Sequence, residues 1–224
     1  MKKILLTLLV AASVLKAEAQ TPKWDSTYRP ASYALKVEQF KCYPNSTNDI
    51  VFIGNSITAG VDWMELLGNT NARNRGISSD ITFGVLQRLD EVTEGKPAKV
   101  FILIGINDIS RNIPDSFILR NYQTIITRIK KESPLTKIYF HTLFPVNNEF
   151  TPSRNQFNKD EHILWVNEEL KKLAAKEKIT LIDLYPHFLN ADKKLDKQYT
   201  GDGLHLNAAG YKLWAEILKK GKFI

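Results

Sequence analysis

Short apolar runs alternate with longer amphipathic segments along most of the chain. Apolar runs predict strands over residues 50–53, 99–105, 137–145 and 179–186, and the polar stretch 71–76 is a weak, short candidate for a further strand. The segments that predict helices are residues 57–67, 80–93, 115–131, 160–176 and 208–219. Unbroken apolar runs are typical of strands buried on both faces of a parallel sheet. Because each strand is followed by a helix, the pattern predicts a three-layer α/β/α fold with a five-stranded parallel sheet.

The length and composition indicate a single globular domain. The chain has 224 residues, of which 43% are hydrophobic and 25% are charged, and it contains no internal repeat or interdomain linker. Residues 20–224 are therefore expected to form one domain. Two connections, residues 144–159 and 186–207, are longer than this fold requires and leave the carboxyl ends of predicted strands. Loops of this length in a compact domain are commonly functional.

The first 19 residues have the pattern of a secretory signal peptide. Two lysines precede an apolar run over residues 4–15, and a short motif with two alanines follows at residues 17–19. An apolar run of this length spans only about 18 Å as a helix, less than the ~30 Å of a bilayer core, which disfavours a membrane anchor. We expect residues 1–19 to be removed on export, which leaves a periplasmic or extracellular protein without stable membrane insertion.

Charge and cysteine content disfavour several classes of function. The formal net charge is +7, and the lysines are spread along the predicted helices, which favours a solvated surface over a nucleic-acid-binding one. Cys42 is the sole cysteine, so no intramolecular disulfide can form, and it is expected to be a small buried residue. The four histidines form no cluster with metal-ligand spacing. We expect neither a metal nor another cofactor.

A polar turn ends the first buried strand. Gly54, Asn55 and Ser56 follow the apolar residues 50–53 directly. A serine at this place could cap the next helix, because serine is favoured where helices begin. It could also present a nucleophile at the carboxyl edge of the sheet, where open α/β folds bind ligands. The turn alone leaves both interpretations open.

Three further motifs follow strands or precede a helix. Asn107 in GIND follows the third strand, and its side-chain N–H can donate to a developing negative charge. Asp202 and His205 lie in DGLH, where the aspartate can orient the imidazole. Gly76 ends NRG, and its backbone N–H can approach a substrate closely. Each motif also has an ordinary interpretation as a turn or a cap, but together with Ser56 they can converge on one edge of the sheet.

These four motifs resemble those of the SGNH hydrolases, also called the GDSL-type esterase and lipase family. That family carries Ser, Gly, Asn and His in separate blocks, the last of which reads Asp-x-x-His, and the resemblance runs from about Ile50 to Leu218. It implies a flavodoxin-like sheet with the strand order 2-1-3-4-5. Before the serine, where the family commonly has aspartate, this chain has Asn55. The consequence of that departure for the turn stays open.

The resemblance implies a serine esterase that works through an acyl-enzyme. Ser56 would be the nucleophile, His205 the general base and Asp202 the residue that orients His205. The oxyanion hole would consist of the backbone N–H groups of Ser56 and Gly76 and the side chain of Asn107. A lysophospholipase, a thioesterase and a non-catalytic carbohydrate-binding protein on the same fold are the alternatives.

The resemblance also implies a substrate class. Exported bacterial members resemble carbohydrate O-acetylesterases, so we expect an acetyl ester of a glycan or of a small molecule. The mostly polar loop 144–159 can hydrogen-bond hydroxyl groups. The aromatic residues in and near this loop, which could face a sugar or pack as ordinary core, are Phe144, Phe150, Phe157 and Trp165. The sequence does not predict the oligomeric state.

Overall fold

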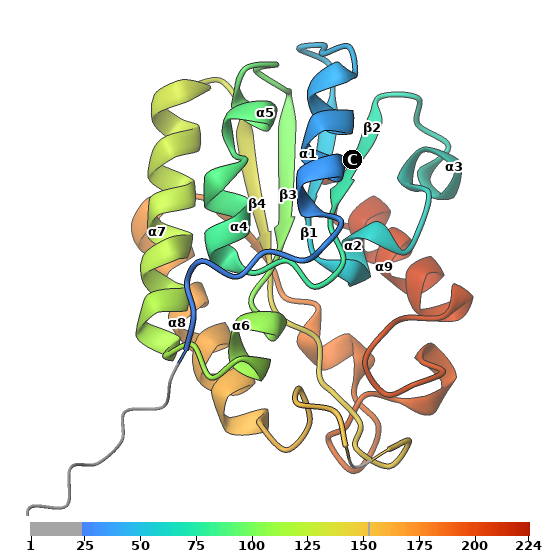
Figure 1. Ribbon diagram of the computed structural model, residues 1–224. Coiled ribbons are helices and arrows are strands. Elements are labelled where there is room, and N and C mark those ends of the chain that lie inside the picture. Colours follow the sequence, from blue (N-terminus) through green and yellow to red (C-terminus); the bar gives the residue numbers. More distant parts are fainter. Residues whose placement is uncertain (1–23, 152) are drawn as a thin grey trace, which may run out of the picture.

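The computed structural model describes residues 24–151 and 153–224, so the predicted signal peptide lies outside the described residues. The sheet consists of β1 (Ile50–Gly54), β2 (Ala72–Gly76), β3 (Lys99–Leu103), β4 (Lys137–His141) and β5 (Thr180–Ile182). All neighbouring strands pair in parallel, in the order β2-β1-β3-β4-β5. The predicted three-layer fold with this strand order is confirmed (Figure 1).

Helices cover both faces of the sheet. They are α1 (Tyr33–Cys42), α2 (Ser56–Ala59), α3 (Trp63–Leu67), α4 (Thr82–Gln87), α5 (Asp90–Thr93), α6 (Ile106–Ser110), α7 (Asp115–Glu132), α8 (Asp160–Glu177) and α9 (Ala208–Lys220), with 3₁₀ turns η1 (Tyr185–Phe188) and η2 (Lys197–Tyr199). Tyr122 of α7 packs against Phe140 of β4 on one face, with ring centroids 4.7 Å apart. Helices α3 and α9 pack on the opposite face.

Aromatic stacking fixes that second face. Phe52 of β1 stacks on its register partner Phe101 of β3 at 4.8 Å between centroids. Trp63 of α3 stacks on Phe52 at 4.0 Å and meets Trp214 of α9 edge-on at 4.8 Å. Because successive strand residues point to opposite faces, apolar side chains are needed at every position of these central strands. This explains why their sequences show no alternation.

Several local elements differ from the prediction. The segment 57–67 forms two helices, because Asp62 starts α3 by accepting a hydrogen bond from the Glu65 N–H at 3.1 Å. The segment 80–93 likewise divides into α4 and α5. The sequence pattern predicts neither α1 nor α6. Cys42, which we expected to be buried, is exposed at the end of α1.

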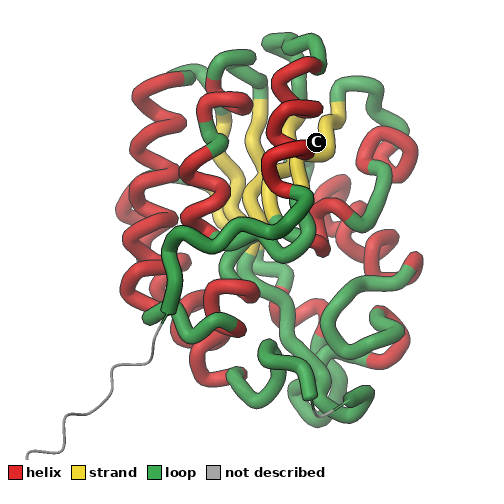
Figure 2. The backbone as a smooth tube through the Cα atoms, viewed as in Figure 1, coloured by secondary structure: helices red, strands yellow, loops and turns green. Residues whose placement is uncertain are grey.

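The two long loops gather at the carboxyl ends of the strands, below the sheet in Figure 2. They are bonded to each other, since the Asn147 N–H donates to the Gly203 carbonyl oxygen at 2.8 Å and Asn147 Nδ2 donates to the Leu195 carbonyl oxygen at 2.9 Å. Phe144 and Phe157 belong to the core rather than to an exposed binding face. The loops thus form a packed layer over the edge that carries Ser56.

Candidate active site

Ser56 begins α2 directly beyond the end of β1. Asn55 caps this helix, because its Oδ1 accepts a hydrogen bond from the Ile57 N–H at 2.9 Å, and Asn55 is fully buried. An amide oxygen can serve this cap as a carboxylate would, so Asn55 can order the turn. Gly54 is required because a Cβ there would lie 2.2 Å from the Leu103 carbonyl oxygen.

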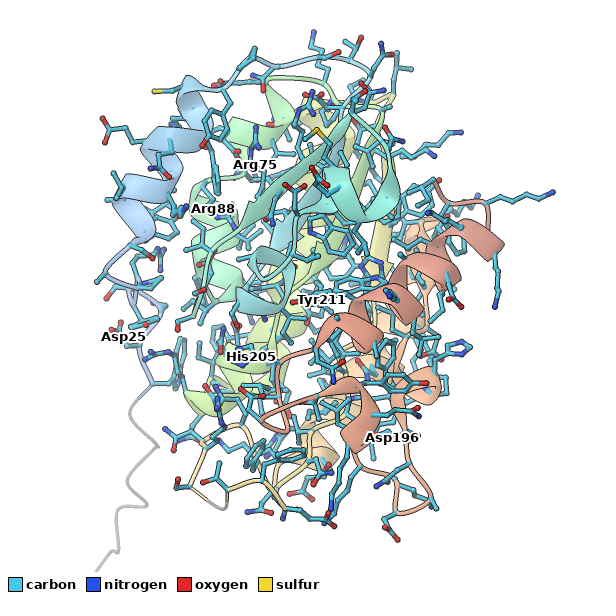
Figure 3. All side chains as sticks on the ribbon, turned by 90° about the vertical axis from the view of Figure 1, so that its right-hand side faces the viewer. Asp25, Arg75, Arg88, Asp196, His205 and Tyr211 are labelled. Atoms are coloured by element: carbon cyan, nitrogen blue, oxygen red, sulfur yellow. The ribbon has the colours of Figure 1, made fainter. Side chains whose placement is uncertain are left out.

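Ser56, His205 and Asp202 form a continuous chain of polar contacts. Ser56 Oγ lies 3.0 Å from His205 Nε2, and His205 Nδ1 lies 2.7 Å from Asp202 Oδ2. Because a carboxylate can only accept, it favours the tautomer with the proton on Nδ1 and leaves Nε2 free to accept from the serine hydroxyl. The structure therefore brings together the three residues that the sequence predicted for a triad. His205 lies at the lower end of the strands in Figure 3.

Asp202 is held in its ionised form. Partial burial alone would raise its pKa, but hydrogen bonds from the His205 side chain and from the backbone N–H groups of His205 and Leu204 outweigh burial and lower the pKa to about 2. The carboxylate thus stays charged across the physiological range. It can stabilise a positive charge on His205 during a reaction.

Specific contacts hold the histidine loop against the nucleophile turn. The Tyr211 hydroxyl of α9 donates to the Ile57 carbonyl oxygen at 2.8 Å. Thr200 Oγ1 donates to the His205 carbonyl oxygen at 2.7 Å. Gly203 has a left-handed φ of 80°, and a Cβ there would lie 2.1 Å from the Asn147 carbonyl oxygen. The loop can therefore adopt this close packing only with glycine at position 203.

Asn107 is the second residue of α6, the short helix that follows β3. Its Nδ2 donates to the Asp80 carbonyl oxygen at 3.0 Å, and Gln156 Nε2 donates to its Oδ1 at 3.4 Å. These contacts define the orientation of the amide and leave the second Nδ2 hydrogen available to a substrate oxygen. Strands β1 and β3 are neighbours in the sheet, so Asn107 and Ser56 belong to the same edge.

Gly76 occupies a different kind of position. Its N–H donates to Asn74 Oδ1 at 2.8 Å, and a Cβ here would lie 2.3 Å from the Ala59 nitrogen. Glycine therefore lets β2 pack closely against α2, and its N–H is already occupied. The structure contradicts the prediction that this N–H belongs to the oxyanion hole.

Ser79 is a site residue that the sequence analysis missed. It adopts a left-handed φ of 63° and borders the same hollow as Asn107. Among the described residues, its backbone N–H forms no hydrogen bond. The resemblance predicted Gly76 instead, because Gly76 matches the glycine of the family's second block, and serine is unusual in a left-handed conformation that commonly selects glycine. Nothing in the sequence distinguishes Ser79 from its neighbours, since only the structure shows that the carbonyl oxygen of the next residue, Asp80, binds Asn107.

A buried ion pair of Arg88 and Asp80 stabilises this edge of the sheet from within the core. Arg88 Nε lies 3.1 Å from Asp80 Oδ2, and both side chains are 0% exposed. Arg88 Nη2 also donates to the Gly54 carbonyl oxygen at 3.2 Å. The guanidinium thus connects the turn that carries Ser56 with the residue whose carbonyl oxygen orients Asn107.

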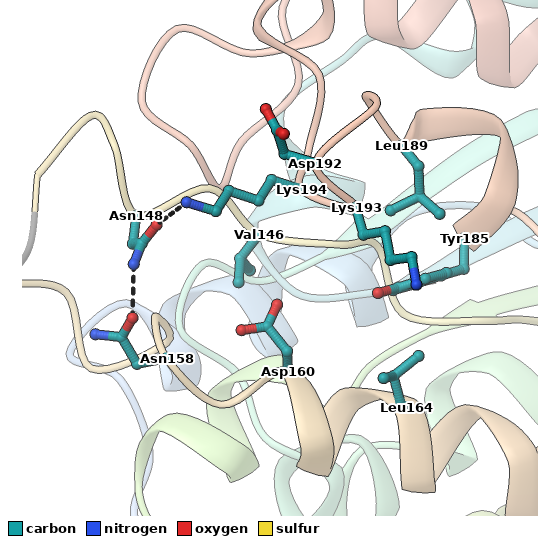
Figure 4. A pocket seen from close by; sticks show the side chains of 10 residues that line it. All are labelled: Val146, Asn148, Asn158, Asp160, Leu164, Tyr185, Leu189, Asp192, Lys193 and Lys194. Atoms are coloured by element: carbon teal, nitrogen blue, oxygen red, sulfur yellow. Dashed lines mark hydrogen bonds between the residues drawn. The ribbon is translucent and has the colours of Figure 1, made fainter.

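Three hollows lie along this edge. A polar hollow of about 480 Å³ is bordered by residues that include Ser79, Asn107, Ser110, Arg111 and Gln156. A recess of about 10 Å³ beside the nucleophile turn is lined by Asn55, Ile57, Leu103, Ile106, Leu143, Phe144, Pro145, Val146 and Leu204. Asn55 supplies the only polar side chain of that lining, and its Nδ2 has no hydrogen-bond partner among the described residues. The third hollow, of about 430 Å³, lies between the long loops and the start of α8 (Figure 4).

The buried histidine has a structural role. His141 Nε2 accepts a hydrogen bond from Trp214 Nε1 at 3.3 Å, and burial lowers the pKa of His141 to about 3. His141 therefore stays neutral within the aromatic core. Within residues 24–151 and 153–224, no group of three or more His, Cys, Asp or Glu side chains is arranged to hold a metal ion.

Known proteins resemble this chain in both sequence and fold. The model of the GDSL-like lipase/acylhydrolase family matches residues 52–213. The human platelet-activating factor acetylhydrolase IB subunit alpha2 is 28% identical over 169 residues, which cover 73% of this chain and 71% of that protein.

Two solved structures extend the comparison. A Streptococcus pneumoniae protein described as a platelet activating factor is 29% identical, with a TM-score of 0.76 and coverage of 85% of this chain and 91% of that one. A GDSL-like lipase from Bacteroides thetaiotaomicron is 24% identical and supports the fold, with a TM-score of 0.75 and coverage of 86% and 98%. Because the family model covers most of the sequence, including the triad, the chain belongs to the GDSL-like lipase/acylhydrolase family, the SGNH hydrolases, and is an ester-hydrolysing serine hydrolase.

Proposed function

We propose that the protein removes acetyl groups from hydroxyl compounds and that its substrates are O-acetylated carbohydrates. The observation that carries the proposal is the small recess of about 10 Å³ beside the nucleophile turn, whose walls include Ile57, Ile106 and Leu204. A space of this size holds about one water-sized group. It would take the methyl group of an acetyl ester and is itself too small for a long acyl chain. A relative named as an acetylhydrolase agrees with this preference.

The contacts of Ser56 support an acyl-enzyme mechanism. Ser56 Oγ attacks the ester carbonyl while His205 Nε2 accepts its proton, and Asp202 stabilises the resulting imidazolium. His205 then returns the proton to the departing alcohol. A water molecule, activated by the same imidazole, attacks the acetyl-serine and releases acetate.

Three N–H groups would bind the oxyanion of the tetrahedral intermediates. We assign them to the Ser56 backbone, the Ser79 backbone and Asn107 Nδ2, with Ser79 taking the role first predicted for Gly76. Loss of one such donor typically raises the barrier by about 2.7–4 kcal/mol. Asn107→Ala is therefore expected to reduce kcat strongly with little change in KM, because the oxyanion exists only during the reaction.

The polar hollow favours a carbohydrate as the alcohol part of the substrate. The hydroxyl, amide and guanidinium groups along its border, from Ser110, Gln156 and Arg111 among others, can hydrogen-bond sugar hydroxyls. The lysophospholipase alternative calls instead for an apolar channel that takes a lipid chain. The lining of this hollow does not resemble such a channel.

Export remains part of the proposal, because the predicted signal peptide lies outside the described residues. Over residues 24–151 and 153–224, no helix combines the length and the apolar character needed to cross a bilayer. We infer that residues 1–19 direct the chain out of the cytoplasm. N-terminal sequencing of the mature protein should then begin at Gln20.

The acyl-chain preference tests the proposal directly. Wild type should hydrolyse p-nitrophenyl acetate faster than the butyrate and octanoate esters, and it should release acetate from an O-acetylated polysaccharide. Ile106→Ala enlarges the recess and should shift the preference towards butyrate. Ile109→Ala is the matched control, because Ile109 is buried in the same helix and does not line the recess. Faster turnover of octanoate than acetate by wild type would favour the lysophospholipase alternative.

A further inference from the structure

One short segment of the loop after β4 contacts both halves of the catalytic site. Arg154 Nη2 lies 2.9 Å from Asp202 Oδ2, and Gln156 Nε2 donates to Asn107 Oδ1 at 3.4 Å. The segment is anchored by Phe157, which is buried and whose N–H donates to the Arg154 carbonyl oxygen at 3.0 Å. Arg154 and Gln156, which are two residues apart in the loop, therefore contact the aspartate of the triad and the amide of the proposed oxyanion hole.

Arg154 binds the same carboxylate oxygen as the catalytic histidine. Asp202 Oδ2 contacts both His205 Nδ1 at 2.7 Å and Arg154 Nη2 at 2.9 Å, while Oδ1 accepts two backbone N–H groups. The four contacts match the roughly four acceptor positions of a carboxylate. The Asp202 side chain is 32% exposed, so on the side of Arg154 it would otherwise face solvent. Arg154 thus completes the coordination of the carboxylate.

We propose that Arg154 is a positioning residue that, together with Gln156, fastens residues 153–157 to Asp202 and Asn107 and sets the two groups relative to each other. The inference rests on the proposed roles of Asp202 and Asn107. The arginine cation shares the negative charge of Asp202, so the carboxylate stabilises a protonated His205 less strongly than an unshared carboxylate would. Arg154 therefore favours the neutral imidazole, which is the form that accepts the serine proton.

The alternative is an ordinary surface ion pair, which contributes little to stability or activity. Both partners are about one-third exposed, as such pairs are. If the pair is ordinary, removal of Arg154 leaves the pH profile of the reaction unchanged. If Arg154 acts on the catalytic carboxylate, its removal shifts that profile. The pH profile therefore separates the two interpretations.

The experiment compares Arg154→Gln, Arg154→Lys and wild type with p-nitrophenyl acetate across pH. Arg154→Gln should lower kcat/KM about 10-fold through misplacement of the triad, and the acid limb of its profile should move to higher pH because the unshared carboxylate favours protonated His205. Arg154→Lys retains the charge and should restore the position of the acid limb. Arg120→Gln removes an exposed arginine of α7 that stacks on Phe117, and it serves as the control with a wild-type profile.

Coupling between the two contacts is the second readout. If one segment is fastened at two points, loss of either contact loosens both, so Gln156→Ala combined with Arg154→Gln should cost less than the product of the single effects. An unshifted acid limb in Arg154→Gln with multiplicative effects in the double variant would overturn the inference. Thermal unfolding of each variant shows whether it is folded, and Arg154→Met, alone and with Gln156→Ala, supplies the same test if Arg154→Gln is not folded.

Covalent labelling separates this inference from the proposed substrate. The pH dependence of Ser56 phosphonylation by a fluorophosphonate reports the same serine and histidine without any natural substrate. A wild-type enzyme that releases no acetate from glycans, but whose labelling profile shifts in Arg154→Gln, would refute the carbohydrate proposal and support the role of Arg154. An equal labelling profile in both proteins would contradict the role of Arg154, whatever the substrate.

Discussion

Ser56 and Asn107 lie just beyond the ends of the central strands β1 and β3, whereas Asp202 and His205 belong to the loop between η2 and α9. Asn107 is only 7% exposed, and the Asn55 that caps the nucleophile helix is fully buried. The side chains of His205 and Asp202 are 39% and 32% exposed. Apart from Ser56, which is partly exposed, the strand-end half of the site is thus enclosed by the core, while the loop half is partly open to solvent.

The two halves also differ in what holds them. The strand-end half rests on the fully buried pair of Arg88 and Asp80, which connects to Gly54 and Asn107. The loop half has buried contacts as well, but the carboxylate of Asp202 depends on partly exposed ones, of which the pair with Arg154 is an example. Buried charges must stay paired, because an unpaired buried charge is costly, whereas exposed pairs are weak and respond to salt and pH. The strand-end half should therefore be the rigid one and the loop half the adjustable one.

The prediction with the largest effect asks whether the halves act as one unit. Ser56→Ala and His205→Ala should each lower kcat by up to about 10⁶-fold, as in other serine hydrolases, and the double variant should be no worse than either. The reason is that formation of the acyl-enzyme needs both the Ser56 nucleophile and the His205 base, so loss of either one already prevents it. Rates with p-nitrophenyl acetate provide the measurement. Multiplicative losses in the double variant would show that the two residues act independently.

The second prediction concerns the stability of the strand-end half. Arg88→Met leaves the Asp80 carboxylate buried without its cation and should lower the free energy of unfolding by about 3–5 kcal/mol. Arg128→Met is the matched control, because the pair of Arg128 and Glu132 is about one-third exposed and should contribute no more than about 1 kcal/mol. Urea denaturation measures both. Similar losses in the two variants would contradict the distinction between the halves.

The sequence predicted the features that follow from the sheet. Apolar runs identified every strand except the polar β2, and the convergence of parallel strand ends placed Ser56, Asn107 and the DGLH motif at one edge. Asp202 and His205 were accessible to prediction because their spacing of three residues lets the carboxylate bind both the His205 backbone and its ring. These positions and contacts follow from the order of the elements along the chain and from short-range spacing, both of which can be read from a sequence.

Contacts that depend on tertiary packing could not be predicted from the sequence. Gly76 is needed for contact with Ala59, and the left-handed turn falls on Ser79, although sequence rules place glycine in such turns. Arg154 reaches Asp202 across 48 residues of chain, from a loop whose path no periodicity specifies. An arginine in a polar loop has no sequence signal that distinguishes it from any other surface charge.

The smallest predicted effect is the response of the loop half to acid. Asp202 has a pKa of about 2 in the folded chain against an ordinary value of about 3.8, so its ionised form favours folding. This contribution is fully present above about pH 4 and is lost as the pH falls towards 2. For a partly exposed group we expect about 1–2 kcal/mol. Asp202→Asn should therefore be less stable than wild type at pH 6.

The difference in stability between wild type and Asp202→Asn should shrink as the pH falls from 4 to 2, because protonation of Asp202 removes the charge that the variant lacks. Urea denaturation at a series of pH values measures this difference. Because both proteins contain the other carboxylates, the contribution of those groups cancels in the difference. Glu216→Gln removes an exposed carboxylate of α9 and should keep a constant, small offset from wild type. A gap between wild type and Asp202→Asn that stays the same down to pH 2 would show that the contacts of Asp202 do not depend on its charge. The loop half would then be no more sensitive to acid than the strand-end half.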